Sequence, residues 1–464
     1  MKKMSDFRSF MFSLVVLVSL ILVAGSAYAT NGYFSSGYSI KNKALAGAGT
    51  ALALDTMSAS TNPAAMAFVG DRVDVGLSFF NPNRGYTVRG DATSGFTPGV
   101  DCNYPGAPLN LGPPCPFGLA TGTVESGKEW FVIPGLGYNK MMNKDYSLGI
   151  SVFGNGGMNT DYGTNTYLGS DPTGIDLMQL FIVPTYARKI NKDHAFGLSP
   201  VIAYQRLEAK GLEQFGTFSS EPTKLTNKGY DSAYGIGARV GYLGEVLPGL
   251  HVGASYQTKI MMNEFDKYAG LFAEQGDFDI PSTWNIGLAY DVTPALTVVF
   301  DVQEIYYSDV DSVGNTFNPQ MNTCFGNQLG GSSTSEIPEC LGNDQGAGFG
   351  WEDMTVLKAG VQWVSNQEWT WRAGYSYAEQ PIGPTEVMFN MIAPGVIEQH
   401  VTAGVTKKLG GNQEVDLSVM RGLSNSITGP NPMDPPDGYY PGSGQTIELE
   451  MDQWEFSVGY SKSF

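Results

Sequence analysis

The strongest constraint on the fold is an alternation of apolar residues with small or polar ones, repeated in many short segments after residue 29. In the segments that begin at Tyr234, Leu296 and Trp369, every second residue is apolar or aromatic. Since successive side chains of a β-strand point to opposite faces of the sheet, each such segment has one apolar face. No run of about 18 apolar residues, the length that a membrane-spanning helix needs, follows residue 29.

The connections between these segments predict how the strands are arranged. Fourteen segments can be traced, and short connections alternate with long ones. Outer-membrane barrels have this pattern because their periplasmic turns are short and their extracellular loops are long, whereas a water-soluble sandwich has no reason to follow it. We therefore predict an all-β fold, a transmembrane antiparallel β-barrel of fourteen strands. The segments begin near Arg72, Glu129, Tyr146, Gln179, His194, Tyr230, Leu250, Phe278, Ala295, Trp351, Glu368, Glu398, Gln413 and Glu450.

Composition agrees with a barrel whose apolar residues face lipid. Charged residues make up 16% of the chain, below the roughly 25% of soluble domains, and there are 59 glycines. In lipid every backbone polar group must bond internally, so a sheet can span only if it closes. The last segment carries alternating aromatic residues such as Trp454 and Tyr460 and ends at Phe464, which resembles the signal by which bacterial barrels are recognised for insertion.

The first 29 residues have the features of a secretory signal peptide. A basic start is followed by the apolar residues 10–25 and by a small-x-small cleavage site at Ala27-Tyr28-Ala29. The mature chain is therefore expected to begin at Thr30 and to reside in the bacterial outer membrane. The net charge of −18 argues against a nucleic-acid partner, because phosphate contacts need Lys and Arg.

Four cysteines fit an exported protein, since an oxidising compartment permits disulfides. Cys102 and Cys115 lie close together in a stretch rich in Pro and Gly, and Cys324 and Cys340 lie in another. Each pair would close a short loop. Pairing between the two stretches remains open at this level.

Residues 30–70 differ from the rest of the mature chain. They are rich in Ala, Gly, Ser and Thr and show little period-two pattern. Asn62 and Pro63, followed by Ala64, read as the start of a helix, with Asn as N-cap and Pro in the first helical position. Gly47 and Gly49 permit tight backbone turns. Such a segment is suited to fill a lumen as a plug, and the alternative is a periplasmic extension.

The motifs of this N-terminal region resemble the FadL-type family of outer-membrane transporters for long-chain fatty acids, which includes relatives that admit aromatic hydrocarbons. The similar motifs are Ala29 to Phe34, the Gly47-Ala48-Gly49 turn, Asn62-Pro63-Ala64 with Met66 to Phe68, Ile280 to Trp284, Trp371 to Tyr377, and Tyr460 to Phe464. The resemblance spans the mature chain, and its N-terminal block is the most specific part.

The resemblance implies a fourteen-stranded barrel that is plugged by an N-terminal hatch carrying the Asn-Pro-Ala motif. The expected division of the chain is therefore a signal peptide at 1–29, the hatch at 30–70 and the barrel at 71–464. The resemblance also implies that hydrophobic substrates are captured near the outer loops and held in a second pocket beside the hatch N-terminus. Uptake is expected to be passive, because no phosphate-binding motif for ATP appears in the sequence. Exit would be sideways through a kinked third strand, which maps to residues 147–158. Gly154, Gly156 and Gly157 would let this strand bend and interrupt its ladder, although dense glycine is also typical of a loop start.

Substrate contacts are predicted from residue type and alternation. A fatty acid needs an apolar tunnel for its tail and a cation for its carboxylate. Arg239, Arg372 and Lys259 are expected to face the lumen and are candidate head-group ligands. The alternative pairs them with lumenal acids such as Asp301, Asp416 or Glu455. At the hatch N-terminus, Tyr33 and Phe34 are candidate apolar lining or simple packing residues.

No motif predicts an enzyme, a cofactor or a metal site, because the three histidines show no metal-ligand spacing. The expected partners are hydrophobic small molecules, outer-membrane lipid and lipopolysaccharide, and a monomer is expected. Two alternatives differ in function: a general diffusion porin, and an adhesin or phage receptor that uses the long loops. A plug-like N-terminus argues against the open pore of a porin.

Overall fold

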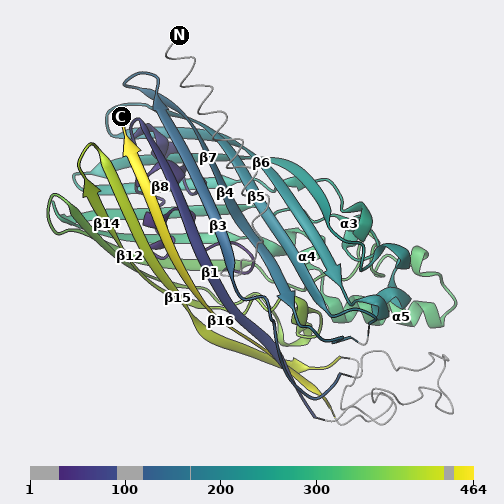
Figure 1. Ribbon diagram of the computed structural model, residues 1–464. Coiled ribbons are helices and arrows are strands. Elements are labelled where there is room, and N and C mark those ends of the chain that lie inside the picture. Colours follow the sequence, from purple (N-terminus) through teal and green to yellow (C-terminus); the bar gives the residue numbers. More distant parts are fainter. Residues whose placement is uncertain (1–30, 91–118, 168, 433–443) are drawn as a thin grey trace.

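The computed structural model describes residues 31–90, 119–167, 169–432 and 444–464. The predicted signal peptide and the pair Cys102 and Cys115 lie outside these residues. Within the described part, sixteen antiparallel strands form one sheet, and its two short members, β2 (Gly122–Glu125) and β9 (Met261–Met262), leave fourteen in the main ring. β1 pairs with β16, which closes the sheet into a barrel (Figure 1). The predicted fourteen-stranded barrel is thus confirmed.

Each of the fourteen strands pairs with neighbours in the chain order, as expected for hairpin connections. The strands are β1 (Arg72–Arg89), β3 (Phe131–Met141), β4 (Tyr146–Asp161), β5 (Gly174–Lys189), β6 (His194–Lys210), β7 (Asp231–Leu247), β8 (Leu250–Gln257), β10 (Thr283–Thr293), β11 (Leu296–Ile305), β12 (Met354–Val364), β13 (Trp369–Tyr377), β14 (Gln399–Leu409), β15 (Gln413–Pro430) and β16 (Thr446–Ser463).

Short and long connections lie at opposite ends of the barrel, here called the short-turn end and the long-loop end. Turns such as 190–193 and 365–368 alternate with loops such as 306–353 and 378–398. β5 and β10 begin at Gly174 and Thr283, about five residues away from the predicted starts at Gln179 and Phe278. The start of β5 is buried on both faces, so the sequence there has no alternation to mark it.

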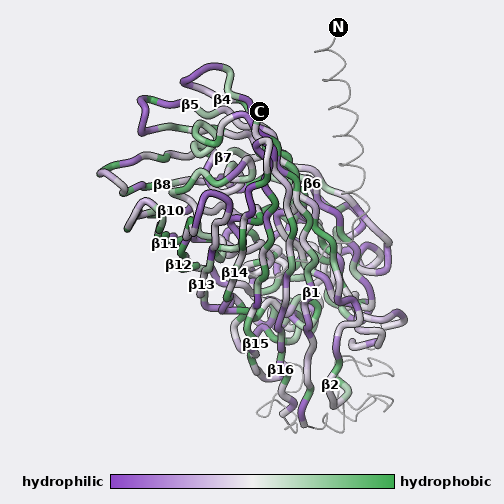
Figure 2. The backbone as a smooth tube through the Cα atoms, turned by 60° about the vertical axis from the view of Figure 1, so that its left-hand side comes forward, coloured by the Kyte–Doolittle hydropathy of each residue, from purple (hydrophilic) through white to green (hydrophobic). Residues whose placement is uncertain are grey.

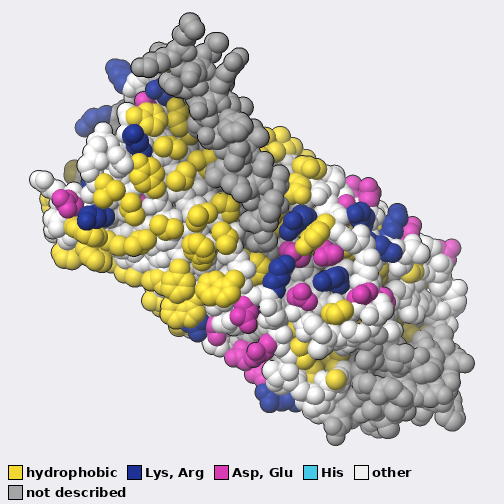
Figure 3. All heavy atoms as spheres, viewed as in Figure 1, with side chains coloured by type: hydrophobic (Ala, Val, Ile, Leu, Met, Phe, Trp, Pro, Cys, Tyr) yellow, Lys and Arg dark blue, Asp and Glu magenta, His cyan; other side chains and the backbone are white. Residues whose placement is uncertain are grey.

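Alternation along the strands separates an apolar outer face from a polar inner face, as predicted. In β13, Trp371 and Tyr375 are exposed, whereas Arg372 and Ser376 are buried. Figure 2 shows hydrophobic and hydrophilic residues mixed along the strands, and Figure 3 shows a broad area of hydrophobic side chains across the barrel surface. None of the helices in the described residues has the length and apolar character that a bilayer crossing requires.

Residues 31–70, here called the lumenal segment, fold against the inner faces of the strands. The segment contains three short helices, α2 (Ile40–Lys43), η1 (Thr56–Ser60) and η2 (Pro63–Ala67). Most of its residues are buried. Its hydrogen bonds reach strands on several sides of the ring, including β1, β4, β7, β11, β14 and β16.

The long loops pack together at the long-loop end and bury a large apolar cluster that also contains Tyr33 and Phe34 of the lumenal segment. Their short helices are η3 (Glu213–Phe218), η4 (Pro222–Lys224), η5 (Asp266–Tyr268), α3 (Ala273–Gly276), η6 (Tyr307–Asp309), α4 (Asp311–Gly314), α5 (Phe317–Leu329), η7 (Thr334–Glu336), η8 (Pro384–Glu386) and η9 (Phe389–Ile392). A disulfide joins Cys324 to Cys340, one of the pairings that the sequence suggested.

Candidate functional site

The lumenal segment is fixed by ion pairs that cross from it to the barrel wall. Lys41 of α2 lies 2.5 Å from Glu414, and Lys43 contacts Glu455. Both lysines are about 4% exposed, and without these carboxylates they would be buried cations with no counter-ion. Glu455, one of the acids that were expected to pair with lumenal arginines, therefore pairs with the lumenal segment.

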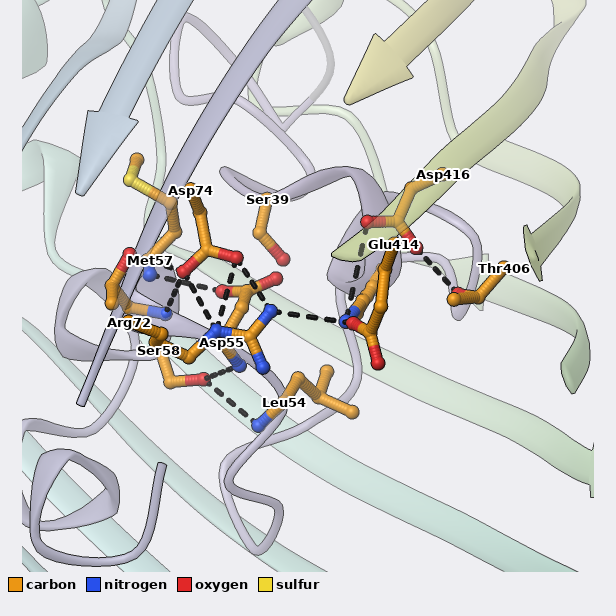
Figure 4. Close-up of polar contacts among 12 residues, drawn as sticks. Ser39, Leu54, Asp55, Met57, Ser58, Arg72, Asp74, Thr406, Glu414 and Asp416 are labelled. Carbon is orange, nitrogen blue, oxygen red and sulfur yellow. Dashed lines mark hydrogen bonds and ion pairs between the residues drawn. The ribbon is translucent and has the colours of Figure 1, made fainter. Parts of the chain in front are cut away.

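A second polar network surrounds the N-terminus of η1 (Figure 4). Asp55 caps this helix by accepting from Met57 N at 2.9 Å. Next to it, Asp74 of β1 accepts from Thr56 and from Arg72, whose Nη2 lies 2.6 Å from the carboxylate. Burial and the neighbouring Asp74 carboxylate raise the pKa of Asp55 from 3.8 to about 6, although Lys41 and Arg72 act in the opposite direction.

The Asn-Pro-Ala motif starts a helix, as predicted, and also attaches it to the wall. Asn62 Oδ1 accepts from Ala64 N, while Nδ2 donates to the carbonyl oxygens of Thr50 and Tyr242, each at 2.8 Å. Pro63 occupies the first position of η2. One side chain therefore caps η2, joins two parts of the lumenal segment and holds both to β7.

The two glycines of the predicted turn have different roles. Gly47 has a φ of +81°, and a β-carbon there would lie 1.6 Å from the Ser36 carbonyl oxygen. Gly49 presents its backbone N–H to the Asp301 carboxylate at 2.7 Å, beside Thr50 at 2.8 Å. Asp301 thus binds backbone N–H groups of the lumenal segment.

The third long strand, β4, pairs with β5 along its whole length but pairs with β3 only in its first half. Its ladder with β3 ends at Phe153, and its register with β5 shifts between Gly154 and Gly156. Beyond that point the lumenal segment takes the place of β3. Tyr33 O accepts from Gly157 N at 3.0 Å, and Asn155 O accepts from Ser35 N at 3.0 Å. The glycines that were predicted to interrupt this ladder lie at the interruption.

Glycine is required where the lumenal segment meets β4. A β-carbon at Gly156 would lie 1.8 Å from the Tyr33 carbonyl oxygen. The bridge between Phe34 and Gly156 brings the two backbones together. The N-terminus of the lumenal segment therefore lies directly against the interrupted part of β4.

Tyr33 and Phe34 belong to an aromatic cluster beside this interruption. The Tyr33 ring centroid lies 5.0 Å from that of Tyr307 and 5.7 Å from that of Trp351. Tyr307 Oη donates to Asn31 O at 2.5 Å. These rings come from the lumenal segment and from the long loop between β11 and β12, so only the folded barrel brings them together.

A small pocket lies between this cluster, β1 and β4. Its apolar lining includes Phe80, Met158, Trp351 and Met451, and its two polar side chains are Arg84 and Asn159. This combination of apolar walls with a few converging polar groups is typical of small-molecule sites. Within the described ranges, no group of three or more His, Cys, Asp or Glu side chains is placed to hold a metal ion.

The predicted head-group ligands are mostly occupied. Arg239 is buried and donates to the carbonyl oxygens of Ala59 and Ser60 and to Gln257. Arg372 is buried and donates to Gln362 at 2.8 Å and to Thr406 at 2.6 Å.

Lys259 does not lie in a strand. It follows the end of β8 in a long loop, 3.1 Å from Asp279, and its side chain is 40% exposed. The prediction of a lumenal position assumed that the alternation of β8 continues to residue 259. β8 ends at Gln257, so the alternation no longer applies to Lys259.

Sequence reasoning missed Lys41, Lys43, Arg84 and Trp351. The two lysines at alternate positions in a segment whose only other charged residue is Asp55 were a usable signal, because buried cations need partners. Arg84 lies on the inward face of β1. The sequence alone predicts that the first strand has already ended there and that a long loop has begun. Trp351 was predicted to begin a strand, whereas β12 begins at Met354, and nothing local marks Trp351 as a member of an aromatic cluster.

Comparisons with known proteins agree with this architecture. A model of the family "Outer membrane protein transport protein (OMPP1/FadL/TodX)" matches residues 20–464. No curated protein sequence matches the chain.

Solved structures with a similar fold include a FadL homologue of Pseudomonas aeruginosa, with 15% identity over 93% of this chain and 100% of that one, at a TM-score of 0.64. The toluene transporter TodX of Pseudomonas putida has 18% identity over 94% and 100%, at a TM-score of 0.60. The toluene transporter TbuX of Ralstonia pickettii has 17% identity over 92% and 99%, at 0.56.

Proposed function

Since the chain belongs to the OMPP1/FadL/TodX family of outer-membrane transport proteins, we propose that it takes up hydrophobic molecules by binding them inside the barrel and releasing them sideways into the bilayer. Long-chain fatty acids and aromatic hydrocarbons are the candidate substrates. Uptake is passive and follows the substrate gradient, and the long-loop end faces the cell exterior among lipopolysaccharide. The protein acts as a monomer.

One observation carries this proposal: a mainly apolar pocket lies beside the interrupted ladder of β4. A water-filled channel offers no affinity for an apolar solute, whereas rings such as Tyr33 and Trp351 do. A substrate in this pocket is close to the only stretch of β4 that lacks a strand partner on its β3 side among the described residues. This proximity supports lateral release near Gly154 to Gly157.

The lumenal segment acts as the hatch in this proposal. Its N-terminus bonds to the interrupted part of β4, and the rest of it packs against the inner faces of other strands. Movement of residues 33–35 away from β4 would break only a few backbone bonds, including that between Tyr33 and Gly157. The ion pairs of Lys41 and Lys43 would meanwhile hold the remainder in place.

The pocket can be tested by filling it. Ala393 lines the pocket and is 5% exposed, and its change to Trp adds a large side chain there. We expect Ala393→Trp to lower uptake of labelled oleate or toluene at least tenfold in a deletion strain that expresses the variant. Val361→Trp on the exposed outer face is the matched control. Wild-type uptake by Ala393→Trp in a correctly folded barrel, or large ohmic conductance steps in the wild-type protein, would contradict the proposal.

A further inference from the structure

The apolar outer face of the barrel ends at a pair of tyrosines on β6 and β7. Toward the long-loop end, charged side chains replace the hydrophobic area of the barrel surface (Figure 3). Along β6 the outward residues Phe196 and Ile202 are exposed, and Tyr204 follows them. Its ring centroid lies 5.2 Å from that of Tyr234, its cross-strand partner on β7. Because tyrosine is enriched where the hydrocarbon core meets the polar head groups, the next outward residue of β6 lies at the level of the lipid head groups.

That residue is Arg206, and its guanidinium lacks a hydrogen-bond acceptor among the described residues. Its Cζ lies 4.2 Å from the ring centroid of Tyr230, so the guanidinium packs over this ring. The one carboxylate within 4.0 Å in the described part of the chain, Asp176, is 3.9 Å from Nη2, too far for a hydrogen bond. Nε is buried without a partner, and the side chain as a whole is 18% exposed. The five N–H donors of this guanidinium are therefore open to a ligand that arrives from the membrane side.

Asp176 does not neutralise the positive charge around it. Its Oδ2 accepts from Lys128 Nζ at 3.0 Å and from Tyr230 Oη at 2.9 Å. Lys128 and Arg206 thus share one carboxylate, although they carry two positive charges. Among the described side chains, Glu208, the cross-strand partner of Asp176, forms no ion pair with either cation within 4.0 Å. Arg206, Lys128, Tyr230 and Asp176 are here called the rim cluster.

Arg421 of β15 is a similar residue whose charge is already compensated. It also alternates with inward residues of its strand, and its guanidinium lies 4.9 Å from the ring centroid of Trp454. Its Nη1 donates to Asp452 at 2.7 Å and to Gln453 O at 3.3 Å. Arg206 has the same aromatic support without such acceptors, which distinguishes a guanidinium that can bind a ligand from one that is already bound.

We propose that the rim cluster binds a phosphate group of lipopolysaccharide, the phosphorylated lipid of the outer leaflet. A guanidinium binds phosphate through two parallel N–H···O bonds, and Lys128 adds a second cation as a point charge. The acyl chains of the same lipid then lie along Ile202 and Ile236, which are exposed below the tyrosine pair. This site is on the outer wall and not in the lumen, so the inference goes beyond the proposed transport. It shares with that proposal only the placement of the long-loop end at the cell exterior.

Lipids that differ in their phosphates test the site. Purified full-length protein in detergent is titrated with bis-phosphorylated lipid A and with the same lipid after enzymatic removal of its phosphates, and native mass spectrometry measures the bound lipid. Wild-type protein should bind the phosphorylated form about tenfold more tightly, because charge-assisted hydrogen bonds are roughly twice as strong as neutral ones. Phosphatidylglycerol, titrated in parallel, offers one phosphate on two chains and should bind more weakly than phosphorylated lipid A.

Three variants locate the binding. Arg206→Gln should weaken binding of phosphorylated lipid A about tenfold and leave binding of the dephosphorylated lipid unchanged. Lys128→Gln should weaken it in the same selective way, and because this side chain is 38% exposed the variant keeps the inference testable if Arg206→Gln fails to fold. Arg421→Gln is the matched control and should alter neither affinity.

Three results would overturn the proposal. Lipid A binding could be unchanged in both rim-cluster variants, or Arg421→Gln could weaken it equally. Phosphatidylglycerol could bind as tightly as lipid A with the same dependence on Arg206, which would assign the rim cluster to phospholipid phosphate in general. None of these results bears on uptake, which is measured separately. A wild-type protein that binds lipid A as expected but takes up neither oleate nor toluene would contradict the transport function and leave the lipid site standing.

Discussion

Tyr33, in the lumenal segment, accepts a backbone hydrogen bond of 3.0 Å from Gly157, in the interrupted part of β4. The neighbouring Gly156 allows this contact because it has no β-carbon. Two segments more than a hundred residues apart in the sequence therefore meet at one point, beside the apolar pocket. The contact joins the proposed hatch to the proposed exit and leads to the first prediction.

Gly156→Ala should detach the N-terminus of the lumenal segment from β4. The added methyl group would overlap the Tyr33 carbonyl oxygen, so one of the two backbones must move. We expect amide exchange in residues 31–38, measured by mass spectrometry, to accelerate at least tenfold while the strands stay protected. Gly410→Ala is the control, since a β-carbon there meets nothing within 4 Å. Unchanged exchange in Gly156→Ala would show that this contact does not hold the segment.

Asn62→Ala should loosen η2 without unfolding the barrel. The substitution removes a helix cap, which contributes about 0.5–2 kcal/mol, and leaves the carbonyl oxygens of Thr50 and Tyr242 without this donor. We expect altered uptake of hydrophobic substrate and normal heat-modifiable migration in electrophoresis. Asn83→Ala, at an exposed site on β1, should leave both unchanged. Wild-type uptake by Asn62→Ala would remove the case for gating by this motif.

Arg239 and Arg372 are expected to be structural. The donors of Arg239 are directed to the lumenal segment and to Gln257, and those of Arg372 to Gln362 and Thr406. Replacing either with Ala should therefore weaken binding of a fatty acid and of its methyl ester by the same factor. A selective loss for the acid would instead identify that arginine as a head-group ligand.

Asp55 should make attachment of η1 depend on pH. Its pKa is raised to about 6 by burial and by Asp74, so the folded segment holds a proton that the unfolded segment, with a pKa near 3.8, has released. Attachment is therefore strongest at low pH and weakens as the pH rises from about 4 to about 6.

Amide exchange of residues 54–60, corrected for its intrinsic pH dependence, measures this effect. Protection should be greater at pH 5 than at pH 7.5 in the wild-type protein. Asp55→Asn keeps an oxygen to accept from Met57 N but does not titrate, so the difference should vanish. Asp145→Asn, in an exposed turn, is the matched control. Greater protection at pH 7.5 would contradict the assignment.

The number of strands and their faces were predictable because the pattern that determines them is local. Period-two alternation at Trp369 to Tyr377 places Arg372 inside and Tyr375 outside whatever the rest of the chain does. The Asn62–Pro63 helix start was predictable for the same reason, since a cap acts on the next few residues. The lack of alternation in residues 30–70 set them apart from the strands, and the family resemblance added the expectation of a hatch and of sideways exit through the third strand.

The sequence alone determined that the strands form a closed sheet with an apolar outer face. The spacing of apolar residues determines the two faces, and the need to satisfy every backbone polar group in lipid requires closure. Only the tertiary structure decided which buried charges meet. Lys41 pairs with Glu414 across 373 positions, while Arg84 meets only neutral acceptors. Ion pairing depends on distances of a few ångströms between distant segments, and no local pattern encodes those distances.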